Sequence, residues 1–176
     1  MGPPTPNTPS NSGFKFYHER QKKQLCLLHA LNNLFQAPRF SKNDLDRLCE
    51  QMDKSAWWNA HRSFIGLGDY DANVLMAAVD KFGYTCTWFD RRSDPKIIQH
   101  EKIFGYIFNV PSESFFPFIK KRHWLSVIRF NGNQFVNLDS KLSYPQRVNN
   151  FNQFAEDLLT NGNTLILIHK REDVCI

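Results

Sequence analysis

Cysteine is scarce in this sequence, and none of it follows a metal-binding pattern. The four cysteines include no CxxC pair, and Cys26-x-x-His29 is only half of a zinc site because no second half follows. We therefore expect no metal, no cofactor and no disulfide framework, as in a reduced intracellular protein. The remaining cysteines are Cys49, Cys86 and Cys175.

Long hydrophobic runs and targeting signals are also missing. No segment approaches the ~20 apolar residues of a membrane span, and the polar, Pro-rich start of the chain does not resemble a signal peptide. The start also lacks the Ser or Thr of a myristoylation signal, and Cys175 is misplaced for prenylation. We expect a soluble cytoplasmic protein with no membrane span, and the nucleus as a second compartment.

The sequence has no stripe of positive charge interleaved with aromatic residues. Its net charge of +5 comes instead from short clusters such as Lys22-Lys23, Arg91-Arg92 and 120–122. A solvated basic surface explains these clusters better than binding to nucleic acid or to an anionic membrane. An acidic patch on a protein substrate is a third reading. We expect a monomer that binds no nucleic acid.

Size and composition predict one folded domain. The chain has 176 residues, of which 41% are hydrophobic and 14% aromatic, which excludes wholesale disorder. Residues 1–13 are rich in proline and predict a flexible tail, and residues 14–176 predict a single domain without internal repeats.

Hydrophobic periodicity predicts helices early in the chain and strands later. This order indicates an α+β fold, with the N-terminal helices packed on a mainly antiparallel sheet. Residues 53–68 break the pattern, and there Trp57 and Trp58 are either buried anchors or a partner-binding surface. The expected helices are 25–36, 41–52, 71–82 and 149–159, the expected strands are 84–89, 103–109, 124–129, 134–138 and 164–169, and a loop is expected over 111–121.

Cys26 is the candidate nucleophile, whereas Cys49 fits the apolar face of the second helix. The first turn of a helix favours an anion, because its amide groups and dipole stabilise negative charge. Lys22 and Lys23 add positive charge near the thiol, and a low thiol pKa is what makes cysteine reactive. Gln21 can reach forward to complete an oxyanion hole.

Among six histidines, His123 is the candidate general base. His29 lies one turn after Cys26 on the same helix, which suits a structural role such as a bond to a backbone carbonyl. His123 instead opens a strand, and the next strand ends at Asp139, whose carboxylate could hold the imidazole in the required tautomer. The alternative for Asp139 is a turn-capping role. The other histidines are His18, His61, His100 and His169. None of them has a carboxylate at a distance in the sequence that suggests support of a catalytic imidazole.

The hairpin between these strands decides whether His123 and Asp139 can meet. With a two-residue turn, the numbers of facing residues sum to 263, and the two side chains point to opposite faces. With a bulged loop over 130–132 the sum is 262, and they face each other. The apolar pattern favours the first register and the chemistry favours the second. We expect the bulged register, or an equivalent bulge nearer the strand ends.

Taken together, these residues resemble the Josephin family of deubiquitinating cysteine proteases. The resemblance extends over nearly everything after Phe14, and it implies a papain-like fold and hydrolysis of ubiquitin conjugates. It further implies that Asp139 takes the third catalytic position, where ataxin-type members have Asn and short, stand-alone Josephins have Asp. The matching pattern is His18-Glu19-x-Gln21-x4-Cys26-x-x-His29-x-x-Asn32-Asn33, followed by His123-Trp124 and Asn137-Leu138-Asp139-Ser140.

The resemblance implies one mechanism, and two other readings stay open. Cys26 would attack the carboxy-terminal carbonyl of ubiquitin, with His123 as base and Gln21 in the oxyanion hole. One alternative is a ubiquitin-binding module that uses Trp57-Trp58 and residues 64–67. The other is a different Cys-His acyltransferase.

Overall fold

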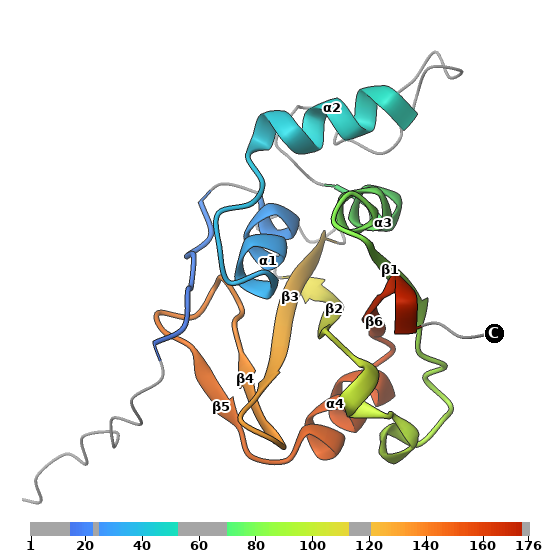
Figure 1. Cartoon of the computed structure of the whole chain (residues 1–176). Helices are drawn as coiled ribbons and strands as arrows, with labels where there is room; N and C mark the ends of the chain where they lie inside the picture. Colours follow the sequence, from blue (N-terminus) through green and yellow to red (C-terminus); the bar gives the residue numbers. More distant parts are fainter. Residues whose placement is uncertain (1–14, 23–24, 53–69, 113–120, 174–176) are drawn as a thin grey trace, which may run out of the picture.

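A computed structural model describes residues 15–22, 25–52, 70–112 and 121–173. Its centre is a six-stranded antiparallel sheet with the strand order β1-β6-β2-β3-β4-β5 (Figure 1). The strands are β1 (Tyr84–Trp88), β2 (Gly105–Ser112), β3 (Lys121–Phe130), β4 (Gln134–Asn137), β5 (Gln146–Val148) and β6 (Thr164–Lys170). The helices are α1 (Cys26–Leu34), α2 (Lys42–Met52), α3 (Ala72–Asp80) and α4 (Phe151–Thr160), with short 3-10 turns at Pro95–Ile97, His100–Lys102 and Arg171–Asp173.

The sheet separates two buried layers, and α1 packs directly on the long strand β3. Even-numbered residues of β3, such as Trp124 and Ile128, join the layer that contains α1, α2 and α3. Odd-numbered residues, such as Leu125 and Val127, join the layer of α4. This alternation follows from the period of two along a strand. The predicted α+β class and antiparallel sheet are confirmed.

Two helix ends show local interactions that fix where the helix begins or ends. Ser41 and Asp44 exchange a capping-box pair at the start of α2, with distances of 2.8 and 3.3 Å between each backbone nitrogen and the other's side-chain oxygen. Cys49 is fully buried in the core, as expected. Gly83, with φ of +78°, follows α3 in the left-handed conformation that glycine adopts most readily.

The strand prediction was wrong in two places. The expected loop over 111–121 begins too early, because Pro111 still faces Arg122 in the ladder. Beyond Asn109 the strand β2 pairs with β3 alone, and an edge position tolerates a proline without an amide hydrogen. The short edge strand β5 was missed, since three residues are too few to show a periodic pattern.

The register of the β3–β4 hairpin differs from both expectations. Val127 faces Asn137 and Phe130 faces Gln134, so the numbers of facing residues sum to 264 rather than 262 or 263. The loop spans residues 131–133, with positive φ at Asn131 and Gly132, two residue types that tolerate it. A shift of two residues from the bulged register leaves every side chain on its face. The bulged loop expected over 130–132 was therefore wrong, but the face of each side chain is preserved.

Two of the predicted segments, the Pro-rich tail over 1–13 and the segment containing Trp57 and Trp58, lie outside the described residues.

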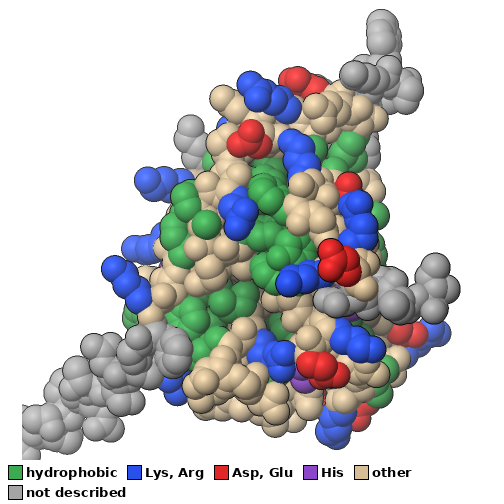
Figure 2. Space-filling model, viewed as in Figure 1, with side chains coloured by type: hydrophobic (Ala, Val, Ile, Leu, Met, Phe, Trp, Pro, Cys, Tyr) green, Lys and Arg blue, Asp and Glu red, His purple; other side chains and the backbone are tan. Residues whose placement is uncertain are grey.

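None of the helices in the described part of the chain has the length and apolarity that crossing a membrane requires. On the face shown in Figure 2, Lys and Arg side chains are dispersed rather than aligned in a stripe.

The fold predicts a strong dependence of stability on the sheet core. Phe108 is completely buried in β2, so we expect Phe108→Ala to lower the free energy of unfolding by about 3–5 kcal/mol. Ile97→Ala is the control, because Ile97 is 65% exposed and its truncation should change stability by no more than about 0.5 kcal/mol. Urea unfolding measures both variants. Equal midpoints would contradict this account of the core.

Candidate active site

The expected contact between His123 and Asp139 is present. His123 Nε2 lies 2.6 Å from Asp139 Oδ1, and the His123 side chain is only 2% exposed. A carboxylate accepts hydrogen bonds, so the proton on this imidazole belongs on Nε2 and leaves Nδ1 as the basic nitrogen. His123 is the third residue of β3, and Asp139 follows the end of β4 by two residues. The hairpin thus brings together a buried imidazole and an oriented carboxylate.

Asp139 also caps the turn in which it lies. Its Oδ1 accepts a hydrogen bond of 2.9 Å from the amide of Lys141, and its own amide donates to Asn137 Oδ1 at 2.9 Å. The turn-capping alternative is therefore correct, but it accompanies the contact with His123 rather than replacing it. Two donors fix the carboxylate, which restricts the orientation of the imidazole that it holds.

The surroundings of Asp139 favour its charged form. Burial alone would raise the pKa of Asp139, but the hydrogen bonds from His123 and the Lys141 amide outweigh burial and, together with the charges of those two residues, hold the pKa below its ordinary value. The carboxylate is therefore the form present at neutral pH, as the orientation of the imidazole requires.

Cys26 is the first residue of α1, as predicted. The residue before it, Leu25, supplies no side-chain capping bond, and Cys26 lies at the positive end of the helix dipole. Cys26 is 5% exposed and belongs to the same buried cluster as Trp124 of β3. The packing of α1 on β3 thus places the cysteine helix against the histidine strand.

Gln21 is joined to the segment that carries Asp139. Its backbone nitrogen donates to the carbonyl of Ser140 at 2.8 Å, and the Ser140 hydroxyl lies 3.4 Å from Gln21 Oε1. An acceptor oxygen held by Ser140 leaves the Nε2 donors of Gln21 to face another group. Ser140 had no role in the sequence interpretation, although it follows Asp139 directly.

A polar network connects α1 with the segment before it. Glu19 accepts from Asn32 Nδ2 at 3.1 Å and also from the Tyr17 hydroxyl. Asn33, completely buried, accepts from the Glu19 amide at 2.6 Å and donates to the Leu138 carbonyl at 2.9 Å. Asn32 and Asn33 were given no role in the sequence interpretation, although two adjacent asparagines inside an apolar helix could have indicated a buried network.

Two of the histidines set aside as bases belong to this region. His29 Nδ1 lies 2.6 Å from Glu19 Oε2, and His29 Nε2 accepts from the Lys22 amide at 3.2 Å. The structural role predicted for His29 is confirmed, but its partners are a carboxylate and an amide rather than a carbonyl. His18 Nε2 donates to the carbonyl of Asp139 at 3.0 Å, a contact that the sequence did not predict.

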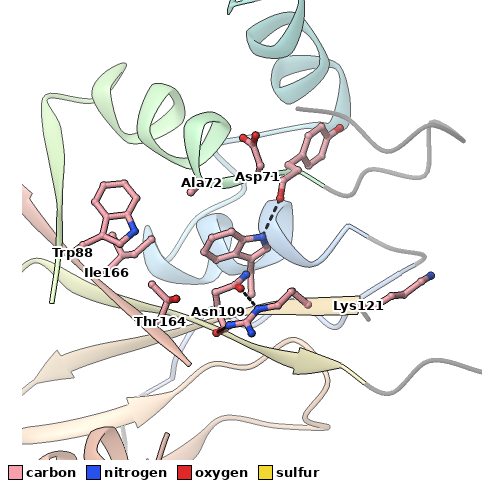
Figure 3. Close-up of a pocket in the computed structure, with 10 residues that line it drawn as sticks. Asp71, Ala72, Trp88, Asn109, Lys121, Thr164 and Ile166 are labelled. Atoms are coloured by element: carbon pink, nitrogen blue, oxygen red, sulfur yellow. Dashed lines mark hydrogen bonds between the residues drawn. The ribbon is translucent and has the colours of Figure 1, made fainter. Parts of the chain in front are cut away.

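An open pocket of about 470 Å³ adjoins the site between the start of α3 and the sheet (Figure 3). Trp124, the residue after His123, forms part of its wall and donates from Nε1 to the carbonyl of Tyr70 at 3.0 Å. Trp88 is 45% exposed at the far side. The pocket is lined by Tyr70, Asp71, Ala72, Trp88, Asn109, Lys121, Arg122, Trp124, Thr164 and Ile166.

Comparison of this sequence with known proteins assigns the chain to a protein family. The α+β fold, with its helix-terminal cysteine and buried imidazole–carboxylate pair, is papain-like. The Josephin family profile matches residues 21–169. The chain is 45% identical to a Josephin-like protein of Drosophila melanogaster over 168 residues, which is 90% of this chain and 76% of that protein. This chain belongs to the Josephin family, which confirms the resemblance found in the sequence.

Two human relatives differ in how much of them this chain spans. Josephin-2 is 38% identical over 134 residues, which covers 74% of this chain and 71% of Josephin-2. Ataxin-3 is 27% identical over 147 residues, which covers 75% of this chain but only 38% of ataxin-3. The similarity to ataxin-3 therefore concerns a minority of that longer protein.

The site predicts how stability depends on pH. Because the pKa of Asp139 is lower in the folded chain, its carboxylate stabilises the fold above the unfolded pKa of about 3.9, and this contribution is lost as pH falls through the folded value. We expect the difference in unfolding free energy between wild type and Asp139→Asn to shrink below about pH 4. Urea unfolding from about pH 7 to about pH 3 measures it. A difference that stays constant over this range would contradict the assignment.

Proposed function

We propose that this protein is a deubiquitinase that hydrolyses peptide or isopeptide bonds at the carboxy-terminus of ubiquitin. The observation that carries the proposal is the 2.6 Å contact between His123 and Asp139 on a strand, β3, against which the helix that begins with Cys26 packs. Membership in the Josephin family supports ubiquitin as the substrate, because the sequence pattern of this chain resembles that of the deubiquitinating cysteine proteases in this family. Cys26, His123, Asp139 and Gln21 have the catalytic roles in this proposal.

The first half of the reaction forms a thioester. His123 Nδ1 accepts the thiol proton, and the Cys26 sulfur attacks the carbonyl carbon of the terminal glycine. The Gln21 side-chain amide and the Cys26 backbone amide stabilise the oxyanion that develops. When the tetrahedral intermediate collapses, the imidazolium of His123 protonates the leaving lysine amine. Asp139 stays ionised and orients the ring.

The second half of the reaction releases ubiquitin. A water molecule gives a proton to His123 as its oxygen attacks the thioester carbonyl, and the Cys26 sulfur departs and recovers the proton. The open pocket supports this proposal, since an extended peptide tail lying there would contact Arg122 and Trp124, the two residues that flank His123 in the sequence. The indole of Trp88 would supply apolar contact at the outer part of the pocket.

The competing functions have less support. The residues assigned to a non-catalytic ubiquitin-binding module, Trp57-Trp58 and 64–67, lie outside the described residues, so that alternative stays a prediction. A different Cys-His acyltransferase would share the thiol and imidazole, but the family pattern favours ubiquitin as the acyl donor.

The proposal predicts that one cysteine carries the activity. Cys26→Ala should lower hydrolysis of a fluorogenic ubiquitin carboxy-terminal amide by at least about a thousandfold while the unfolding midpoint stays close to that of wild type. Cys86→Ala is the matched control, because burial raises the pKa of Cys86 to about 12 and keeps it a thiol at neutral pH. Full activity of Cys26→Ala, or an equal loss in both variants, would refute the assignment of Cys26.

A further inference from the structure

The His29 ring connects two points of the segment that carries Gln21. Nδ1 contacts the Glu19 carboxylate at 2.6 Å, and Nε2 accepts from the Lys22 backbone amide at 3.2 Å. Glu19 and Lys22 flank Gln21 on its two sides in the sequence. The ring is buried, with 10% of its side chain exposed, and it projects from a helix that packs on β3. The contacts therefore tie both sides of Gln21 to a rigid element.

The two contacts require one particular tautomer. The Lys22 amide can only donate, so His29 Nε2 must present its lone pair, and the ring proton must then be on Nδ1. That proton points at Glu19, whose carboxylate is the matching acceptor. Glu19 also accepts from Asn32 and Tyr17, which restricts its own orientation. The neutral ring with hydrogen on Nδ1 is therefore the form that fits both neighbours.

We propose that His29 is a positioning residue that holds residues 19–22 in the conformation in which the Gln21 side chain can reach the oxyanion. This inference rests on the proposed function for its catalytic consequence. In the proposed reaction, His29 contacts neither the substrate nor the reacting atoms. The contact of its Nε2 with the Lys22 amide is the one that matters for catalysis, because it fixes the chain on the side of Gln21 that leads to Cys26.

Two conservative variants separate the contacts of the ring. The side-chain nitrogen of Asn can replace Nδ1, so His29→Asn keeps a donor for Glu19 and loses the acceptor for Lys22. The side-chain oxygen of Gln reaches the place of Nε2, so His29→Gln keeps an acceptor for Lys22. We expect His29→Asn to lower kcat for ubiquitin amide hydrolysis by about tenfold to a hundredfold, with little change in KM. His29→Gln should recover most of that loss.

Alkylation of Cys26 distinguishes positioning from damage to the fold or the thiol. Displacement of halide from a haloacetamide forms no oxyanion, so its rate at Cys26, identified by peptide mass spectrometry, should stay within about twofold of wild type in both variants. His100→Gln is the matched control. Because the Gln side chain reaches the place of Nε2 and not of Nδ1, it removes a similar contact, 2.6 Å from His100 Nδ1 to the Tyr106 hydroxyl in the α4 layer, and should lower stability without lowering kcat.

The exchange rate of the Lys22 amide hydrogen, followed by NMR, tests the contact without any substrate. Faster exchange in His29→Asn than in wild type and His29→Gln supports the proposal. Equal exchange in the two variants, equal loss of kcat in both, or a parallel loss of alkylation overturns it. If wild type fails to hydrolyse the ubiquitin amide, the proposed function is refuted, and the Lys22 exchange then decides alone whether His29 holds residues 19–22.

Discussion

The side chain of Asn33 connects the three segments on which the candidate site is built. Its Oδ1 accepts from the Glu19 amide at 2.6 Å, and its Nδ2 donates to the Glu19 carbonyl at 3.2 Å and to the Leu138 carbonyl at 2.9 Å. These segments carry Gln21 and Asp139, and Asn33 itself lies on the helix that begins with Cys26. One buried amide thus fixes the relative position of oxyanion donor, nucleophile and carboxylate.

The energetic reason for this arrangement is the cost of an unsatisfied buried group. Leaving one partner of a buried hydrogen bond unpaired costs about 1–3 kcal/mol, and Asn33 is completely buried. The segment before α1 therefore cannot move away from the end of β4 unless the Asn33 side chain and its backbone partners lose their hydrogen bonds or become exposed to water. His29 and Asn32, both buried on the same helix, extend the network to Glu19. The sheet supplies the other rigid half, since His123 lies on its longest strand. A site held by such elements keeps its geometry without help from the ligand.

The sequence predicted the elements better than their pairing. Periodicity located α1 to α4 and five strands, because this signal is local. The register of the β3–β4 hairpin depends on the conformations of Asn131 and Gly132, which the apolar pattern does not determine. The meeting of His123 and Asp139 was nevertheless predicted, because registers that differ by two residues keep the same faces. The partners of Asn33 and His18 could not be predicted, since Leu138 and Asp139 are more than a hundred residues away in the chain.

The central claim is that Cys26 reacts with the carboxy-terminus of ubiquitin inside a site completed by His123 and Asp139. Its most direct test is the reaction of the protein with ubiquitin that carries an electrophile at its carboxy-terminus, followed by peptide mapping of the adduct. We predict a single covalent adduct on Cys26 that forms much more slowly in His123→Ala. Binding of the probe without an adduct, or an adduct on another cysteine, would contradict the account.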